Sequence, residues 1–161
     1  MRHHVYFGLG SNLGNRHMLL EQAIDALQQH VGSLVACSSF IETEPWGFES
    51  EHRFLNAVVQ FTTEYSPLDT LLATQTIERQ LGRTQKSCDG QYHDRPIDID
   101  ILMYDDIRLD ETYNVDGRVV RLTLPHPHMH ERDFVMKPLA EIDIHRSCLS
   151  LLNNILPGIS S

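Results

Sequence analysis

The segment between Arg95 and Tyr104 constrains the fold of this chain more than any other feature. Within it, Ile97, Ile99 and Ile101 alternate with two aspartates. Because successive side chains of a β-strand point to opposite faces, this spacing predicts a strand with one apolar face and one acidic face. The order of the other elements indicates which sheet this strand joins.

The rest of the chain supplies the other elements of an α+β fold. Apolar residues recur at three- and four-residue steps over 15–30, which predicts a helix, and Ser66 followed by Pro67 has the form of a helix start. Strands are expected over 3–10, 34–43, 54–63 and 95–104, and helices over 15–30 and 66–81. The order β-α-β-β-α-β is the split βαβ arrangement of ferredoxin-like folds, so we expect an antiparallel sheet with both helices on one face.

The residues after 104 are expected to form a C-terminal extension of the same domain. Their pattern is weak at first, and then predicts a short strand over 119–124 and helices near 135–141 and 147–156. A length of 161 residues suits one domain, which we place over 1–161.

Composition excludes several classes of function. The net charge of −9 argues against nucleic acid as the main partner, because phosphate backbones attract basic surfaces. No apolar run approaches the about 20 residues of a membrane helix, and the N-terminus lacks the apolar core of a signal peptide. Three widely spaced cysteines without a CxxC motif are typical of reduced thiols. We therefore expect a cytoplasmic protein with no membrane contact, and a monomer.

The acidic face of the 95–104 strand is the first candidate for chemistry. Asp98 and Asp100 are expected to lie about 6.5–7 Å apart along the strand. Two carboxylates at this spacing can hold one hard cation, or bracket a pair of cations about 3.5–4 Å apart. The alternative is a half-buried strand whose acidic face is simply solvated.

The second expected helix carries polar residues on its apolar side. Its stripe is formed by Leu68, Leu71 and Leu72. At about 100° per residue, Gln75 falls at the centre of this stripe and Glu78 on its flank. Buried polar groups need hydrogen-bond partners or a ligand, so these two side chains would face a polar cavity beside the sheet. Alternatively, the C-terminal half of the helix turns toward solvent.

Glycines and cations give weaker signals of phosphate binding. The glycine-rich turn over 8–15 can cradle phosphate, but a tight strand–helix turn has the same composition. Arginine binds phosphate in a bidentate manner, although each cation taken singly is typical of ordinary surface charge. These cations are Arg83, Lys86, Arg95, Arg121 and Arg132.

Two further segments carry groups that could bind a ligand. Three histidines alternate over 126–130, but the neighbouring prolines argue against a regular strand, which favours a loop with one functional histidine over a zinc site. Asn56 lies beside Phe54, and Phe134 follows later in the chain. An amide among aromatic rings suits a flat heterocycle, and core packing is the alternative.

Together these segments occur in a recognisable order. They are GLGSNLG at 8–14, ETEPWG at 42–47, FLN at 54–56, QTIE at 75–78 followed by GR at 82–83, RPIDIDI at 95–101, and LPHP at 124–127 followed by RDF at 132–134. The set closely resembles the 6-hydroxymethyl-7,8-dihydropterin pyrophosphokinases of folate biosynthesis, over about residues 5–142.

The resemblance implies an enzyme that transfers the β,γ-pyrophosphoryl group of ATP to the hydroxymethyl group of the pterin and releases AMP. It implies that Asp98 and Asp100 are catalytic and bind two Mg²⁺ ions. Arg83 and Arg95 match catalytic arginines that meet the phosphates. The positions implied for ATP binding are Gln75, Glu78, Arg121, Thr123 and His126. Those implied for the pterin pocket are Thr43, Trp46, Phe54, Asn56 and Phe134.

Two other classes of function are also compatible with the residues. A metal-dependent phosphohydrolase could use the same D-x-D pair and histidines, and would release phosphate from ATP without a pterin. A ferredoxin-like ligand-binding module would bind a ligand without turnover. Formation of AMP from ATP and Mg²⁺, with and without the hydroxymethyl pterin, distinguishes the three.

Overall fold

An antiparallel sheet forms the centre of the structure, a computed structural model that describes residues 2–43, 53–82 and 96–142. Its strands are β1 (His3–Ser11), β2 (Gly32–Cys37), β3 (Ile41–Thr43), β4 (Phe54–Thr63) and β5 (Asp98–Tyr104). The two long helices are α1 (Arg16–His30) and α2 (Pro67–Gln80). They are followed by a hairpin of β6 (Leu109–Val115) and β7 (Arg118–Leu124), a 3-10 helix at Met129–Glu131 and a helix over 133–142.

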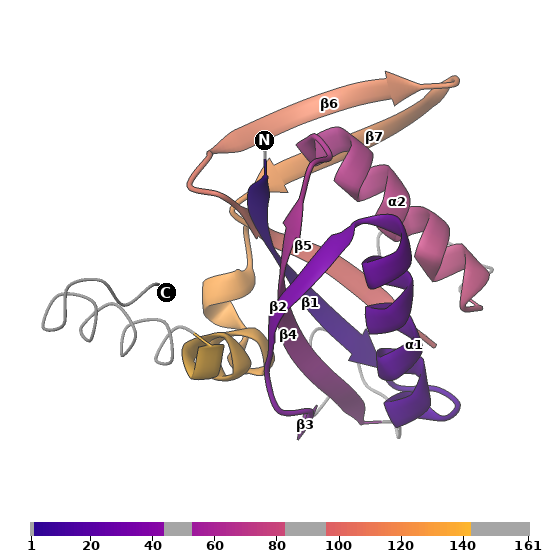
Figure 1. Ribbon diagram of the computed structural model, residues 1–161, viewed down its shortest axis with the longest axis vertical. Coiled ribbons are helices and arrows are strands. Elements are labelled where there is room, and N and C mark those ends of the chain that lie inside the picture. Colours follow the sequence, from indigo (N-terminus) through magenta and orange to yellow (C-terminus); the bar gives the residue numbers. More distant parts are fainter. Residues whose placement is uncertain (1, 44–52, 83–95, 143–161) are drawn as a thin grey trace, which may run out of the picture.

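The strand order confirms the predicted fold class. Hydrogen-bonded neighbours follow the order β2-β4-β1-β5, every pair is antiparallel, and the short β3 also pairs with β4. Two helices connect these strands in the order expected of the split βαβ arrangement. Both helices cover the same face of the sheet (Figure 1).

Each face of the sheet has its own apolar cluster. On the first face, α1 buries Leu20, Ala23 and Leu27 against the sheet. The cluster on the second face consists of Tyr6, Val58, Leu102, Met129, Val135, Leu139 and Ile142. Figure 1 shows the C-terminal helix on the side of the sheet opposite α1 and α2. The C-terminal extension therefore supplies a second layer, on the face that the two long helices leave uncovered.

The starts of both long helices follow from their sequence. The side chain of Asn15 caps α1 by accepting a hydrogen bond from Met18 N at 3.1 Å. Ser66 caps α2 in the same way, accepting from Asp69 N at 3.1 Å. Pro67 occupies the first position of α2, where no backbone donor is needed.

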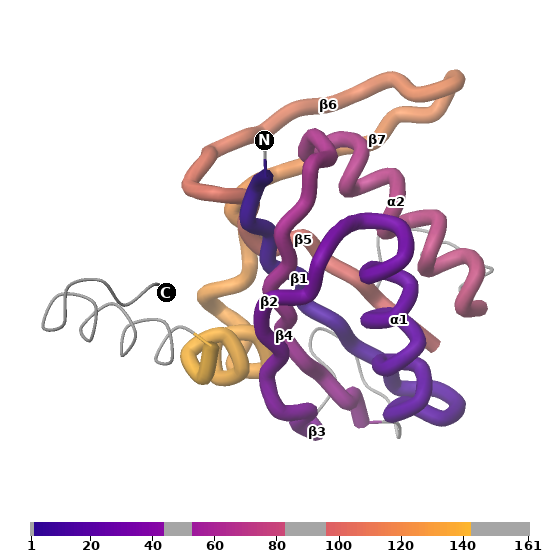
Figure 2. The backbone as a smooth tube through the Cα atoms, viewed as in Figure 1, coloured from indigo at the N-terminus to yellow at the C-terminus, as the bar shows by residue number. Residues whose placement is uncertain are grey.

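Two elements differ from those expected. The segment 34–43 forms two strands because Ser38 interrupts it: its hydroxyl accepts from Val58 N at 2.9 Å in place of a backbone carbonyl. β6 was not predicted, since its sequence is mostly polar and it is a strand through its pairing with β7. Figure 2 shows this hairpin projecting beyond the main sheet. The helix expected near 147–156 lies outside the described residues.

The buried face of α2 is not the one predicted. The three leucines expected to form its stripe are only half-buried. Its buried residues are Thr70, Thr74, Ile77 and Glu78. Thr70 and Thr74 can be buried because their hydroxyls donate to backbone carbonyls of the preceding turn, at 2.8 and 2.7 Å. The prediction from the leucine spacing was therefore wrong about which side of α2 faces the sheet. It treated the threonines as exposed polar residues, although their hydroxyls form hydrogen bonds within the helix.

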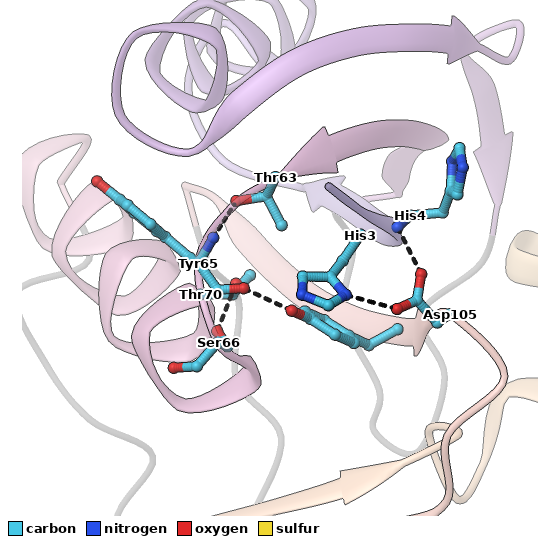
Figure 3. A network of polar contacts seen from close by, with 8 residues as sticks. His3, His4, Thr63, Tyr65, Ser66, Thr70 and Asp105 are labelled. Carbon is cyan, nitrogen blue, oxygen red and sulfur yellow. Dashed lines mark hydrogen bonds and ion pairs between the residues drawn. The ribbon is translucent and has the colours of Figure 1, made fainter. Parts of the chain in front are cut away.

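A polar network joins the end of β5 to β1 (Figure 3). Asp105 has a left-handed backbone, with φ of 49°, and its carboxylate accepts from His4 N at 2.7 Å and lies 2.7 Å from His3 Nδ1. Although burial raises the pKa of Asp105, these contacts hold it below its ordinary value. The Tyr104 hydroxyl donates to the backbone oxygen of Tyr65, and burial followed by the charge of Asp105 raises the pKa of Tyr104 to about 12.

We expect Asp105→Asn to destabilise the protein at neutral pH and to lose this effect in acid. A carboxyl whose pKa is lower in the folded chain stabilises the fold above its unfolded pKa of about 3.9. That contribution disappears as the pH falls through the folded value. Asparagine tolerates the left-handed backbone, so the substitution removes mainly the charge. Urea unfolding of both proteins from about pH 7 to about pH 2.5 measures the effect.

Asp106→Asn is the matched control, because it changes the neighbouring exposed carboxylate. Its unfolding midpoint should run parallel to that of the wild type across the pH range. A stability gap for Asp105→Asn that stays constant down to the lowest pH would contradict the role given to the network.

Candidate active site opposite the helices

One row of residues crosses three strands on the face opposite α1 and α2. Gly10 of β1 pairs with Asp98 of β5 on one side and with Asn56 of β4 on the other. Directly paired residues share a face, and neighbouring strands lie about 4.8 Å apart, so the backbones of Asp98 and Asn56 are about 10 Å apart. A Cβ on Gly10 would lie 3.0 Å from Asn56 Oδ1, so glycine allows the amide to approach β1 closely.

Asp98 and Asp100 lie on this face of β5, as their alternation with buried isoleucines predicted. Both aspartates are half-buried. The Nη1 atom of Arg132 is 3.7 Å from Asp100 Oδ2, and its guanidinium carbon is 5.6 Å from the centre of the Phe134 ring. Arg132 is only 6% exposed, so a buried cation lies beside the carboxylates. From the sequence, Arg132 was only one of several scattered cations that could bind phosphate. Its place in the RDF segment at 132–134 could have indicated that it lies at the site.

His126 lies beside the same charged groups. Its backbone N–H donates to the backbone oxygen of Leu102 at 2.8 Å, which fixes the loop against β5. Burial, followed by electrostatic interactions with Arg132 and His128, lowers the pKa of His126 to about 4 against a smaller opposing effect of Asp98. The ring is therefore neutral at pH 7. Because Nδ1 accepts from His128 N at 3.2 Å, Nε2 carries the proton and can donate to a ligand.

Glu78 reaches from α2 to the strand that carries the aspartates. Its Oε2 atom accepts from Ile99 N at 2.8 Å, midway between Asp98 and Asp100. β5 is the last strand of the sheet, so this backbone donor needs a partner from outside the ladder. One turn earlier, Gln75 has a buried Oε1 atom without a hydrogen-bond partner in the described structure. Both polar side chains singled out on α2 thus have buried atoms, and the carboxylate of Glu78 supports the backbone of β5; whether they face a ligand stays a prediction.

The predicted acceptor residues within the described chain lie on the same face. Asn56 is 3% exposed, and its Nδ2 atom donates to Thr43 Oγ1 at 2.5 Å. Phe54 pairs directly with Thr43 across β3 and β4. Phe134 lies in the C-terminal helix, half-buried against the second apolar cluster. That helix is held at its far end, where Glu141 accepts from Ser39 N at 3.0 Å and from Ser39 Oγ at 2.9 Å.

Arg121 and Thr123 belong to a separate group on the hairpin. Both donate to the carboxylate of Asp110 on the neighbouring strand: Arg121 through Nε and Nη2, each at 3.0 Å, and Thr123 through its hydroxyl at 3.2 Å. Asp110 was not among the expected site residues. It meets Arg121 and Thr123 only because β6 pairs with β7, and β6 was not predicted from the sequence. The remaining expected residues, Trp46, Arg83 and Arg95, lie outside the described structure.

The donor set suits a magnesium ion shared with a substrate. Mg²⁺ is usually bound by one or two carboxylates together with substrate phosphates and water, rather than by a cage of protein ligands. Among the described residues, no group of three or more histidine, cysteine, aspartate or glutamate side chains could hold a metal. Asp98 and Asp100, which share one face of β5, are two carboxylates of the kind that can bind Mg²⁺ in this way.

These features define a class of site in which two carboxylates and a buried arginine lie at one end and a buried amide lies at the other. Paired carboxylates with adjacent cations are typical of metal-assisted phosphoryl transfer. A sequence profile of the 7,8-dihydro-6-hydroxymethylpterin-pyrophosphokinase family matches residues 6–144. The chain belongs to this family.

Curated relatives support this membership along most of the chain. The 2-amino-4-hydroxy-6-hydroxymethyldihydropteridine pyrophosphokinase of Porphyromonas gingivalis is 55% identical over 141 residues, which cover 86% of this chain and 89% of the relative. The protein of the same name from Bacillus subtilis is 40% identical, covering 88% and 79%. The family resemblance seen in the sequence is thereby confirmed, whereas the roles of individual site residues stay predictions.

Solved structures support the fold. HPPK-DHPS of Plasmodium falciparum with pteroate has a TM-score of 0.73 at 13% identity, covering 96% of this chain and 46% of that one. An HPPK-DHPS structure in complex with substrates has a TM-score of 0.69 at 14% identity, covering 99% and 46%. This chain therefore spans less than half the length of these structural relatives.

We expect Glu78→Ala to loosen β5, because Ile99 N would lose its buried partner. An unmade buried hydrogen bond costs about 1–3 kcal/mol, so the unfolding midpoint should fall and exchange of the Ile99 amide hydrogen should accelerate. Glu78→Gln retains an acceptor oxygen and should lose less stability. Thermal unfolding and hydrogen exchange of both variants measure this; an unchanged Ile99 exchange rate in Glu78→Ala would refute the supporting role.

Proposed function

We propose that this chain transfers the β,γ-pyrophosphoryl group of ATP to 6-hydroxymethyl-7,8-dihydropterin in folate biosynthesis. The observation that carries the proposal is the row Asp98–Gly10–Asn56, which places a carboxylate pair and a buried amide about 10 Å apart on one face. That separation suits a polyphosphate at one end and a flat acceptor at the other. Family membership and the names of the curated relatives support the same reaction.

In this proposal the hydroxymethyl oxygen of the acceptor bonds to the β-phosphorus of ATP. The bond from that phosphorus to the oxygen shared with the α-phosphorus breaks, AMP leaves with the electron pair, and the hydroxyl proton passes to solvent. Asp98 and Asp100 would hold two Mg²⁺ ions, which when bound neutralise the polyphosphate and align the reacting oxygens.

Cations and hydrogen-bond donors of the chain would hold the nucleotide. Arg132 lies beside Asp100 at the face of the sheet, and the neutral His126 offers a proton on Nε2. Arg83 and Arg95 are proposed to meet the phosphates. The other residues proposed for ATP binding are Gln75, Glu78, Arg121 and Thr123.

The acceptor would bind at the other end of the row. The hydrogen bond to Thr43 fixes the orientation of the Asn56 amide. Its second N–H donor and its oxygen acceptor can then form hydrogen bonds with the amide edge of a pterin. Phe54 and Phe134 are proposed to stack on the two faces of the ring, and Trp46 to line the same pocket.

We also propose that the chain acts as one domain over 1–161, as a cytoplasmic monomer without nucleic-acid or membrane partners. The net charge of −9 supports the exclusion of nucleic acid. Of the helices in the described ranges, none combines the length and hydrophobicity needed to cross a bilayer.

Release of AMP from ATP and Mg²⁺ tests the proposed reaction. We expect AMP to form only when the hydroxymethyl pterin is present, and EDTA to abolish its formation because the carboxylates need the cation to bind the polyphosphate. Phosphate release without pterin would instead indicate a phosphohydrolase. Binding of ATP or the pterin without any product would indicate a ligand-binding module.

The same assay with the Asp100→Ala variant tests the proposed metal-binding role of this residue. AMP formation should fall about 100-fold or more, since even indirect changes at metal sites cost about 10–100-fold. Asp106→Ala removes an exposed carboxylate outside the site and should leave the rate unchanged. A folded Asp100→Ala protein with near wild-type activity would refute the metal assignment.

We expect substitutions at the two ends of the row to separate the two substrates. Phe134→Ala should weaken pterin binding through lost stacking, and Asn56→Ala should weaken it by about 1–3 kcal/mol because the pterin edge loses its partner. Neither should much change the affinity for a nonhydrolysable ATP analogue, which calorimetry measures without pterin. Equal losses for nucleotide and pterin in Asn56→Ala would show that the two-pocket assignment is wrong.

A further inference from the structure

Arg16, the first residue of α1, contacts strand β3 and the residue that precedes strand β4, beside the proposed acceptor pocket. Its Nη1 atom donates to the backbone oxygen of Arg53 at 2.8 Å, and its Nη2 atom donates to Glu42 Oε2 at 2.9 Å. Arg53 Nη1 lies 3.5 Å from the other oxygen of Glu42. One carboxylate therefore joins two arginines, and three separate parts of the chain meet at this point.

This cluster lies directly behind the pocket. Glu42 immediately precedes Thr43, and Arg53 immediately precedes Phe54. Because successive strand residues point to opposite faces, Glu42 is on the side of α1 when Thr43 is on the side of the pocket. A contact made on the helix side of the sheet therefore sets the position of a side chain on the other side.

The strand that carries Thr43 is short. β3 has three residues and pairs with β4 from Ile41 to Thr43. Few ladder hydrogen bonds fix so short a strand, and a slip of one residue would turn Thr43 away from the pocket. Arg16 adds a connection from β3 and the start of β4 to α1, whose first turn is capped by Asn15.

The cluster acts mainly by fixing the relative position of the two segments, and the energy of its ion pair matters less. The side chains of Arg16 and Glu42 are 31% and 44% exposed, and ion pairs at such exposure contribute little to stability. The hydrogen bond from Arg16 lowers the pKa of Glu42, so the carboxylate is charged at neutral pH. Two nitrogens of one rigid guanidinium bind two different segments, which a single lysine ammonium does not reproduce.

We propose that Arg16 is a positioning residue for the acceptor substrate. By holding Glu42 and the backbone of Arg53, it fixes β3 against β4 and so keeps the Thr43 hydroxyl on Asn56 Nδ2, which aims the Asn56 amide. This inference rests on the proposed function. It adds a residue that lies outside the pocket and affects the affinity for the acceptor but not for the nucleotide.

Separate titrations of the hydroxymethyl pterin and of a nonhydrolysable Mg²⁺–ATP analogue test the proposal. Arg16→Ala should weaken pterin binding and raise the KM for pterin about tenfold, because small misplacements of a binding group are costly. Affinity for the ATP analogue should stay within about twofold of the wild type, because the nucleotide groups lie on other elements. Arg16→Lys should restore part of the loss. Arg108→Ala removes an exposed arginine outside the cluster and is the matched control.

A double-mutant cycle separates positioning from general destabilisation. Thr43→Val removes the hydroxyl through which Arg16 is argued to act. In that background Arg16→Ala should cause little further loss of pterin affinity, whereas a merely structural effect would add in full. Full additivity, or an equal loss of pterin and nucleotide affinity in Arg16→Ala, would overturn the proposal.

The remaining outcomes separate this inference from the proposed function. If the wild type binds pterin and Arg16→Ala binds it equally well, the positioning role is wrong and the proposed function stands. If the wild type binds ATP but no pterin, the proposed function fails and the role of Arg16 fails with it. If Arg16→Ala does not fold, Arg16→Lys and Glu42→Gln replace it, and unchanged pterin affinity in both overturns the proposal.

Discussion

The pairing of β1 with two neighbours is the constraint on which the rest of the structure depends. β4 lies on one side of β1 and β5 on the other, so a single register places all three strands. On the helix face this register stacks Val5, Phe7 and Leu9 into the main apolar cluster. On the opposite face the same register lines up Asp98 and Asn56 around a glycine. The core and the candidate site are therefore two consequences of one set of backbone hydrogen bonds.

Three of the polar groups buried near the site are held by contacts with the sheet or with a neighbouring charge. Glu78 accepts from the edge of β5, Asn56 donates to a threonine on β3, and Arg132 lies beside Asp100. Burial makes such contacts directional and costly to break, because an unpaired polar group loses its hydration without compensation. Among the described residues, the side chains of Glu78 and Asn56 are thus positioned by contacts with the strands of the sheet.

The sequence predicted those parts of the fold that local periodicity controls. Alternation placed Asp98 and Asp100 on the strand face opposite the isoleucines, and the cap residue Ser66 marked the start of α2. Features that depend on contacts between distant segments could not be predicted in this way. β6 is a strand through its pairing with β7, Asp110 meets its partners across that hairpin, and the buried threonines of α2 look polar in a one-dimensional pattern. The residues proposed for acceptor binding came from the family resemblance, since no local pattern distinguishes Asn56 from a core amide.

The late place of β5 in the sequence, as the partner of the first strand, limits the order in which this sheet can form during synthesis. Gly10, Thr43 and Asn56, which lie at the proposed acceptor end, are all translated before α2. Val5 must wait for its partner Tyr104, which emerges from the ribosome much later. A nascent chain can therefore pair β1 with β4 and cover them with α1 while the carboxylate end of the site does not yet exist. Until β5 is synthesised, one edge of β1 lacks its native partner, and an unpaired strand edge can pair with a wrong strand.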